Sequence, residues 1–153
     1  MAGSTDAKTG EKIFGRHVAG LQNVGSYQVS GAPFITGSAA LDAGAEHTIT
    51  FPTVAKSILV INPGTVDVRV HFAPVVVNDG GDAKVYAQNH FLTVSGSAAA
   101  LSTTNELRLD CKCAELYISN ATSNDDAVYQ VYAELTGIPA ARMFALTGSG
   151  ITQ

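Results

Sequence analysis

Tryptophan is absent from this chain of 153 residues, and charged residues are scarce. Lys, Arg, Asp and Glu make up 14 % of the sequence, whereas they are about a quarter of a typical globular protein. The net charge is −4 and no basic block occurs, so we expect no nucleic-acid partner. A chain with so few charges exposes small neutral side chains or buries part of its surface in an assembly.

Long hydrophobic runs and a cysteine framework are also missing. No segment approaches the length that spans a membrane, and residues 1–12 lack the apolar core of a secretory signal. The two cysteines, Cys111 and Cys113, are too few and too close together for a disulfide framework. We therefore expect a protein that is made in a reducing cytoplasm and does not enter a membrane.

Alternation of apolar and polar residues is the main positive signal. Residues 65–72 alternate strictly, which predicts a strand with one buried and one solvated face. Residues 57–61 are almost entirely apolar, as in a strand that is covered on both faces. The turn-forming residues 62–64 (Asn-Pro-Gly) separate the two segments. We therefore predict a β-hairpin over residues 56–72, in the middle of the fold.

Similar patterns predict strands at 46–51, ending at Pro52, and at 84–94, 106–113, 114–118 and 127–136. The apolar positions change parity near residues 112–114, which predicts a bulge or corner there. Pro139 is expected to open a helical turn, because proline suits the first helical position.

Many short strands, without a long amphipathic helix, predict an all-β fold. The architecture that we expect is an antiparallel β-sandwich, jelly-roll-like, with an extended N-terminal arm. The arm is assigned to residues 1–41, where apolar residues are irregular and glycines are frequent. The sandwich domain is assigned to residues 42–146 and a flexible tail to residues 147–153.

Candidate chemical sites are few. Cys111 and Cys113 point the same way on a strand, but a structural zinc site needs four ligands and the chain has no second pair. We interpret them as small buried core residues. Asp67, Arg69 and His71 share the solvated face of one strand, where such a row is usually a solvated or interface surface.

Three short matches have simpler explanations. Residues 79–82 and 123–126 resemble calcium loops in composition only, because the ligand spacing is absent. Residues 120–122 match a glycosylation sequon, which we attribute to loop composition. No nucleophile motif or carboxylate pair can be identified. We predict no enzymatic activity, no catalytic residue, no metal and no cofactor.

Five stretches together carry a family resemblance: LQNVGSYQVS (21–30), FPTVAKSILVIN (51–62), HFLTV (90–94), ELYIS (115–119) and LTGIPAARMFALTGSG (135–150). They resemble small virion structural proteins of tailed bacteriophages, especially those that infect marine bacteria and cyanobacteria. The resemblance carries no catalytic motif. It implies a non-enzymatic particle component, and within that class we favour a capsid decoration (cement) protein on the capsid surface of the virion.

Such a role implies the major capsid protein as partner, self-association as a possible homotrimer, and synthesis in the host bacterial cytoplasm. The candidate interface residues are Ile13, Phe14, Val18, Leu21, Val24, Tyr27, Phe34, Ile35, Asp67 and Arg69. A tail, neck or baseplate component is the first alternative. A carbohydrate- or cell-surface-binding module is the second, although aromatic residues are only 7 % of the chain.

Overall fold

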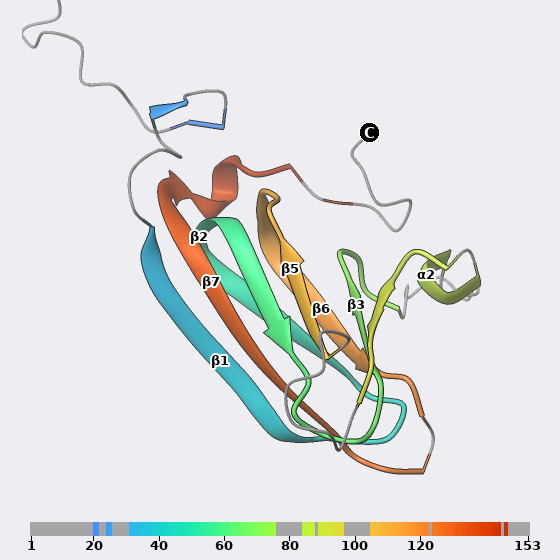
Figure 1. Ribbon diagram of the computed structural model, residues 1–153. Helices are drawn as coiled ribbons and strands as arrows, with labels where there is room; N and C mark the ends of the chain where they lie inside the picture. The colour runs from blue at the N-terminus through green and yellow to red at the C-terminus, as the bar shows by residue number, and fades with distance from the viewer. Residues whose placement is uncertain are drawn as a thin grey trace, which may run out of the picture.

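The computed structural model describes residues 20, 21, 24, 25, 31–75, 84–87, 89–96, 105–122, 124–144 and 146. Seven strands form one antiparallel sheet in the order β1-β7-β2-β6-β3-β4, and β5 pairs with β2 beside this path (Figure 1). The strands are β1 (Ala32–Leu41), β2 (Glu46–Ile61), β3 (Val68–His71), β4 (Leu92–Val94), β5 (Glu106–Leu109), β6 (Cys113–Asn120) and β7 (Ala127–Pro139). Two short helical turns are α2 (Lys84–Ala87) and η1 (Ala140–Arg142).

The long strand β2 belongs to two layers. Its residues 46–55 pair with β6, whereas residues 53–61 pair with β7 and residues 58–61 also pair with β5. The pairing with β6 shifts register between Thr50 and Ala55, where the strand passes from one layer to the other. The first layer is therefore β1-β7-β2-β5 and the second is β2-β6-β3-β4 (Figure 1). This is the sandwich-like, all-β antiparallel fold that the sequence predicts.

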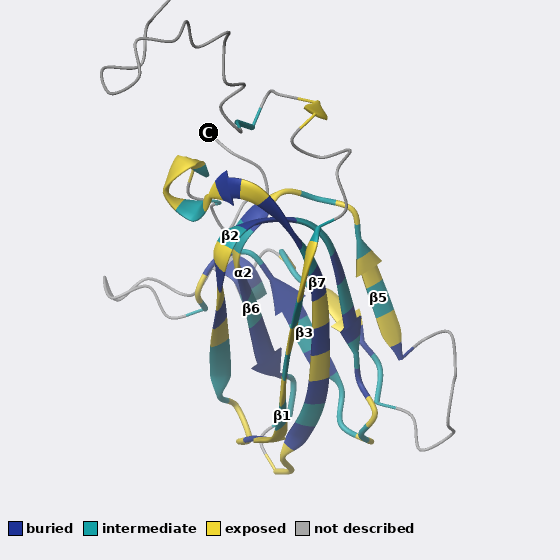
Figure 2. Ribbon diagram, turned by 90° about the vertical axis from the view of Figure 1, so that its left-hand side faces the viewer, coloured by how far each residue is buried: buried dark blue, intermediate teal, exposed yellow. Residues whose placement is uncertain are grey.

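The inner faces of both layers share one apolar core. Ile58, Val60 and Val131 come from the first layer, whereas Leu116 and Ile118 come from the second. Figure 2 shows the resulting alternation of buried and exposed residues along β7. Each fully buried side chain of this size contributes about 1.5–3 kcal/mol relative to leaving it exposed.

Phe51 lies at the bend of β2 and is fully buried. Its ring meets the ring of Phe34 on β1 edge to face, with centroids 5.3 Å apart. This contact joins the edge strand of the first layer to the position where the two layers divide. Phe34 is thus a packing residue of the sandwich rather than part of a separate arm.

The predicted hairpin over residues 56–72 is wrong, because β6 lies between β2 and β3 in the sheet. The turn after β2 is fixed by the side chain of Asn62, which is fully buried. Its Nδ2 donates to the carbonyl oxygens of Val66 (2.8 Å) and Val94 (3.0 Å), and its Oδ1 accepts from the Gly64 N–H. The chain is thereby tied to β4 and does not return along β2.

Three predicted boundaries also differ. Pro52 does not end its strand; it is exposed within β2, in the irregular part of the ladder where no donor is required. The predicted strand 84–94 is the helical turn α2 followed by the three residues of β4. Residues 32–41, which were assigned to the arm, form β1 and pair with β7. The sheet therefore begins about ten residues before the expected boundary at residue 42.

Other predictions are confirmed. The strand at 127–136 is β7, and Tyr129, Val131, Ala133 and Leu135 all face the core. The chain breaks between β5 and β6 at the predicted parity change. The helical turn η1 follows Pro139. The tail at 147–153 lies outside the described residues, and a jelly-roll connection stays a prediction.

Candidate interaction surface

The outer face of the first layer carries an apolar row across four strands. Ile35 of β1 is opposite Tyr132 of β7, Tyr132 is opposite Leu59 of β2, and Leu59 is opposite Arg108 of β5. Ile35 is 76 % exposed and Tyr132 is 36 % exposed. Three large apolar or aromatic side chains are thus lined up on the outer face of the first layer, and the row ends at a cation.

A shallow groove of about 650 Å³ runs beside this row, between β1 and β7. Ile61 and Val128 line it together with Ile35 and Tyr132, and residues 36–39 of β1 contribute only small side chains. None of the ten residues of β1 is charged. We refer to Ile35, Leu59, Ile61, Val128 and Tyr132 as the outer apolar patch.

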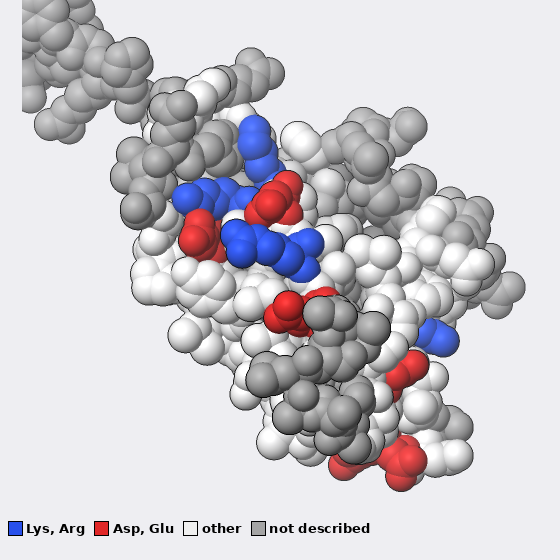
Figure 3. Space-filling model, in the orientation of Figure 1, with Lys and Arg blue, Asp and Glu red and all other residues white. Residues whose placement is uncertain are grey.

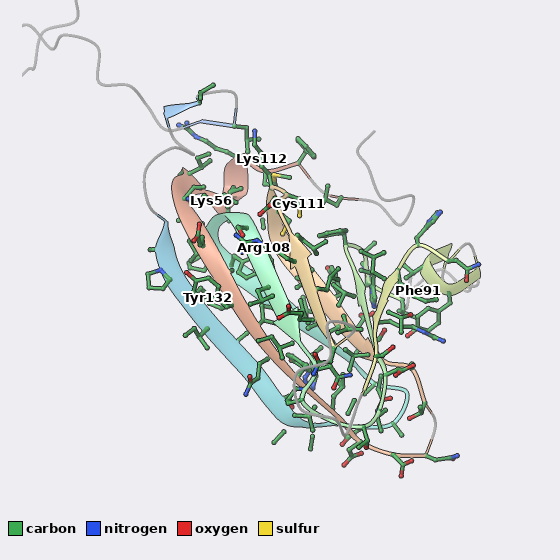
Figure 4. The ribbon with its side chains drawn as sticks, in the orientation of Figure 1. Lys56, Phe91, Arg108, Cys111, Lys112 and Tyr132 are labelled. Atoms are coloured by element: carbon green, nitrogen blue, oxygen red, sulfur yellow. The ribbon has the colours of Figure 1, made fainter. Side chains whose placement is uncertain are left out.

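Charged residues border the patch on one side. Lys56 Nζ lies 3.0 Å from Glu134 Oε2, and Arg108 Nε lies 3.7 Å from Asp110 Oδ1. Figure 3 shows positive and negative side chains interspersed on the upper part of this face. Figure 4 places Lys56 and Arg108 above Tyr132. Such exposed pairs add little stability. Their arrangement gives the patch a polar rim, as protein interfaces have.

The outer face of the second layer carries a polar row. Thr48 of β2 is opposite Tyr117 of β6, which is opposite His71 of β3. The Tyr117 hydroxyl donates to Glu115 Oε2 at 2.9 Å. Burial, followed by this hydrogen bond, raises the pKa of Tyr117 to about 12. This row differs from the apolar row of the first layer. A separate groove of about 480 Å³ beside Tyr117 is lined largely by apolar side chains, among them Met143 and the half-exposed Phe144.

Asp67, Arg69 and His71 were expected on a solvated strand face, but neighbouring elements cover them. The guanidinium carbon of Arg69 lies 4.7 Å from the ring centroids of both Tyr86 on α2 and Phe91. Asp67 Oδ1 accepts a hydrogen bond from the Gly96 N–H at 2.8 Å. The prediction of a free subunit contact here is wrong for His71, and Asp67 and Arg69 are engaged within the chain.

His71 is 1 % exposed and forms a serine–histidine pair with Ser119, which is also 1 % exposed. The carbonyl oxygen of Ala73 can only accept, so Nδ1 of His71 donates to it at 2.7 Å. In the neutral ring, Nε2 then accepts from the Ser119 hydroxyl at 2.9 Å. Burial lowers the pKa of His71, although the bond to Ala73 and the nearby Glu46 oppose the shift.

This pair has the hydrogen-bonding pattern of an activated serine, but it has no access to a substrate. Both side chains are buried, and the ring of His71 stacks on Tyr117 with centroids 5.9 Å apart. Glu46 Oε2 lies 3.6 Å from Nε2 and accepts from the Val75 N–H at 2.8 Å. The pair therefore fastens residues 71–75 to β6 and β2.

Cys111 and Cys113 are adjacent, but Cys111 lies in the break between β5 and β6 rather than on a strand, so the interpretation as buried core residues is confirmed for Cys113 alone. Cys113 is buried, whereas Cys111 is half-buried. The hydrogen bond between the thiols lowers the pKa of Cys111, while the same bond and burial raise the pKa of Cys113. Within the described part of the chain, no three metal-ligating side chains come together.

The glycosylation sequon at residues 120–122 has a structural explanation. Asn120 of the sequon is 3 % exposed, and its Nδ2 donates to the carbonyl oxygens of Leu41 and Asp125. Its Oδ1 accepts from Thr122, so the amide closes a turn and cannot carry a glycan. Residues 79–82, the first of the two loops that resemble calcium sites, lie outside the described ranges.

The interface candidates are distributed between described and undescribed segments. Ile13, Phe14, Val18 and Tyr27 lie outside the described residues. Val24 is exposed, and the Leu21 carbonyl oxygen accepts from Lys112 Nζ at 2.6 Å. Phe34 faces the core, and Ile35 faces solvent. Of the described candidates, Ile35 alone belongs to the outer apolar patch.

Leu59, Ile61, Val128 and Tyr132 were missed as interface candidates. The sequence did indicate a second buried surface at residues 57–61, because apolar side chains on both faces predict a strand whose two faces are both covered. Among the elements that the structure describes, the core covers one face only, and Leu59 and Ile61 stay half-buried on the other. None of the described strands or helical turns forms the second cover that the sequence pattern predicts.

The chain matches no protein-family model, no curated protein and no solved structure. The helical turns that the structure describes are too short to cross a bilayer. The case for a function therefore rests on the residues themselves and on their arrangement.

Proposed function

We propose that this protein is a non-enzymatic structural component of a virus particle, and specifically a decoration protein on the capsid of a tailed bacteriophage. The observation that carries the proposal is the row of Ile35, Tyr132 and Leu59 on the outer face of the first layer, which no other described strand or helical turn covers. Monomeric soluble proteins rarely leave a large contiguous apolar surface exposed, and such a surface commonly marks a protein partner. The resemblance of five stretches of the sequence to phage virion proteins supports the major capsid protein as that partner.

The physical mechanism is burial of apolar surface on the assembled shell. Removing apolar area from water contributes about 25 cal/mol per Å². The charged rim of Lys56, Glu134 and Arg108 would then fix orientation more than affinity. The N-terminal residues would extend the contact across a neighbouring capsid subunit and gain order when they bind.

Binding of the purified chain to decoration-free capsids tests the proposal. We expect Tyr132→Asp to weaken binding at least about tenfold, because a carboxylate would be buried in the contact. Thr48→Asp is the matched control, since Thr48 is exposed on a strand of the opposite outer face. Equal binding by both variants would remove the outer apolar patch from the argument.

Deletion of residues 1–24 tests the arm separately. We expect weaker attachment to the capsid but an unchanged cooperative unfolding transition, because the sheet begins at Ala32. Loss of cooperative unfolding would show that these residues are part of the folded domain.

Electron cryomicroscopy of the particle that carries the chain distinguishes the remaining roles. Density over the whole capsid lattice supports the decoration role. Density at the tail, neck or baseplate would assign the chain to that position instead. Absence from any particle, with affinity for a glycan, would favour the carbohydrate-binding alternative.

A further inference from the structure

β1 is an open edge of the sheet. Among the residues that the structure describes, its only strand neighbour is β7. No described strand lies on the other side of β1, which forms the left margin of the sheet in Figure 1. An open edge presents N–H and C=O groups to any other strand, and proteins usually block it with lysine, other charges or a very short strand. β1 has ten residues and no charge, so Pro33 is its one blocking residue.

We propose that two copies of this chain pair through β1 in antiparallel orientation, with Thr36 of each copy at the twofold axis. The partner is thus a second copy of the same strand. The absence of charge permits this, because an isologous contact brings the same strand of both copies together, where like charges would repel. This inference does not depend on the proposed function.

The outward-facing backbone groups belong to Pro33, Ile35 and Gly37. Backbone groups alternate in direction along a strand, and a proline within a sheet faces the unpaired side, because it has no N–H to give. Gly37 fits the same assignment: a Cβ there would lie 2.7 Å from the Tyr129 carbonyl oxygen of β7. Outward-facing residues of one copy must meet outward-facing residues of the other.

Only a few registers satisfy this condition, and the one centred on Thr36 is favoured. It places Ile35 of each copy opposite Gly37 of the other. Both residues have an N–H and a C=O that face outward, so each of these two pairs can form two N–H···O bonds. It also places Phe34 opposite Ser38, and Thr36 opposite Thr36. Large side chains then face small ones, and threonine pairs are favourable across strands.

The neighbouring register, centred on Ile35, is poorer. It would place each Pro33 opposite Gly37, two residues from the axis, where the proline leaves a carbonyl group without a donor. In the register centred on Thr36 the same loss falls one residue further from the axis, where Pro33 is opposite Ala39. It would also put two Ile35 side chains against each other. The register centred on Thr36 uses the part of β1 that pairs regularly with β7, before the shift between Ser38 and Leu41.

Such pairing would join the two first layers into one continuous sheet, with both outer apolar patches on the same side. A single strand edge is a small contact, below about 1,200 Å², and belongs to the weak class of interfaces. We therefore expect reversible dimers with a dissociation constant in the micromolar range.

Sedimentation equilibrium of the full chain measures this association. We expect Ile35→Lys to raise the dissociation constant at least about tenfold, because lysine on an edge strand opposes strand addition. Leu92→Lys is the matched control, since Leu92 is an exposed apolar residue on the other edge strand, β4. Its dimers should persist. Thermal unfolding verifies that both variants fold.

Cysteine cross-linking tests the register. Thr36→Cys should give disulfide-linked dimers under mild oxidation, above the background of the unmodified chain. Ser38→Cys is on the same strand and face, but in this register its two copies are four residues apart along the strand, about 13 Å. That separation exceeds the roughly 7 Å limit for a disulfide, so no linked dimer should form.

Several results would overturn the inference. A monomer at all concentrations, a trimer as the largest species, or dimers that persist in Ile35→Lys would exclude pairing through β1. Linked dimers of Ser38→Cys in preference to Thr36→Cys would exclude the register. A monomer that still binds capsids would overturn this inference and leave the proposed function standing.

Discussion

Nε2 of His71 lies 2.9 Å from Oγ of Ser119, and both side chains are sealed from solvent between β3 and β6. In this contact Nε2 accepts a hydrogen bond, so the folded protein favours the neutral form of the His71 imidazole. It also ties residues 71–75 to the second layer, because the Ala73 carbonyl oxygen accepts from the same ring.

The first prediction concerns acid stability. Burial lowers the pKa of His71 in the folded chain, against an ordinary value of 6.5 in the unfolded chain. Between these two values only the unfolded chain takes up the proton, so the free energy of unfolding should fall as the pH is lowered below about 6.5. Above that pH both states are neutral at this residue, and its contribution is complete.

Urea unfolding of the wild type and His71→Gln between pH 5 and 8 measures this dependence, and the variant should have a flatter profile in this window. The charged and titratable groups that face His71 are Glu46, Arg69, Tyr86 and Tyr117. Since Glu46 raises the pKa of His71, Glu46→Gln should extend the loss to lower pH. An unchanged slope in His71→Gln would contradict the assignment.

The second prediction concerns the turn after β2. Asn62→Ala removes the donors to Val66 and Val94 and the acceptor for the Gly64 N–H. Buried groups that lose a partner cost about 1–3 kcal/mol each, so we expect a loss of at least about 3 kcal/mol in the free energy of unfolding. Gln130→Ala, at an exposed amide on β7, should change it by less than about 0.5 kcal/mol. Similar losses in both variants would show that the Asn62 network adds no special stability.

The third prediction compares two glycines. A Cβ at Gly96 would overlap the backbone of Thr65 and Val66, whereas a Cβ at Gly137 meets nothing within 4 Å. Gly96→Ala should therefore lower the thermal midpoint strongly, by the equivalent of about 3 kcal/mol or more, since backbone cannot give way as a side chain does. Gly137→Ala should be neutral or slightly stabilising. A tolerated Gly96→Ala would mean that the chain near Thr65 moves away easily.

The fourth prediction concerns the thiols. Cys111 is half-buried and its pKa is lowered by the bond from Cys113, whereas the pKa of Cys113 is raised. Because the thiolate is the reactive form, iodoacetamide should label Cys111 first, and Cys113 should react only after unfolding. Mass spectrometry of peptides at successive times distinguishes the two sites. Equal labelling rates in the folded chain would contradict this order.

The strand patterns of the sequence predicted local structure well and pairing poorly. β7 was evident because Tyr129, Val131 and Ala133 alternate with outward residues over a long run. The hairpin prediction failed because the turn chemistry of residues 62–64 says nothing about where the next strand pairs. What decides that is the long-range contact of Asn62 with Val94, 32 residues away.

The site was harder to predict, for a related reason. The parity of Arg69 and His71 was correct, and they do lie on the outward face of β3. That face is covered by Tyr86 and Phe91, and no strand pattern in residues 84–91 indicated a helical turn that would pack there. The outer apolar patch was visible only in part, because it is assembled from β1, β7 and β2, whose order the sequence does not reveal.

The sharing of β2 between the layers has a mechanical consequence. In a sandwich of two separate sheets, a load on one sheet reaches the other through side-chain packing and connecting loops. Here a force on the first layer also travels along the covalent backbone of β2 into the second, through the bend at Phe51 and Pro52. The layers cannot slide past each other without breaking ladder hydrogen bonds on both sides of that bend, so the domain is built to resist shear.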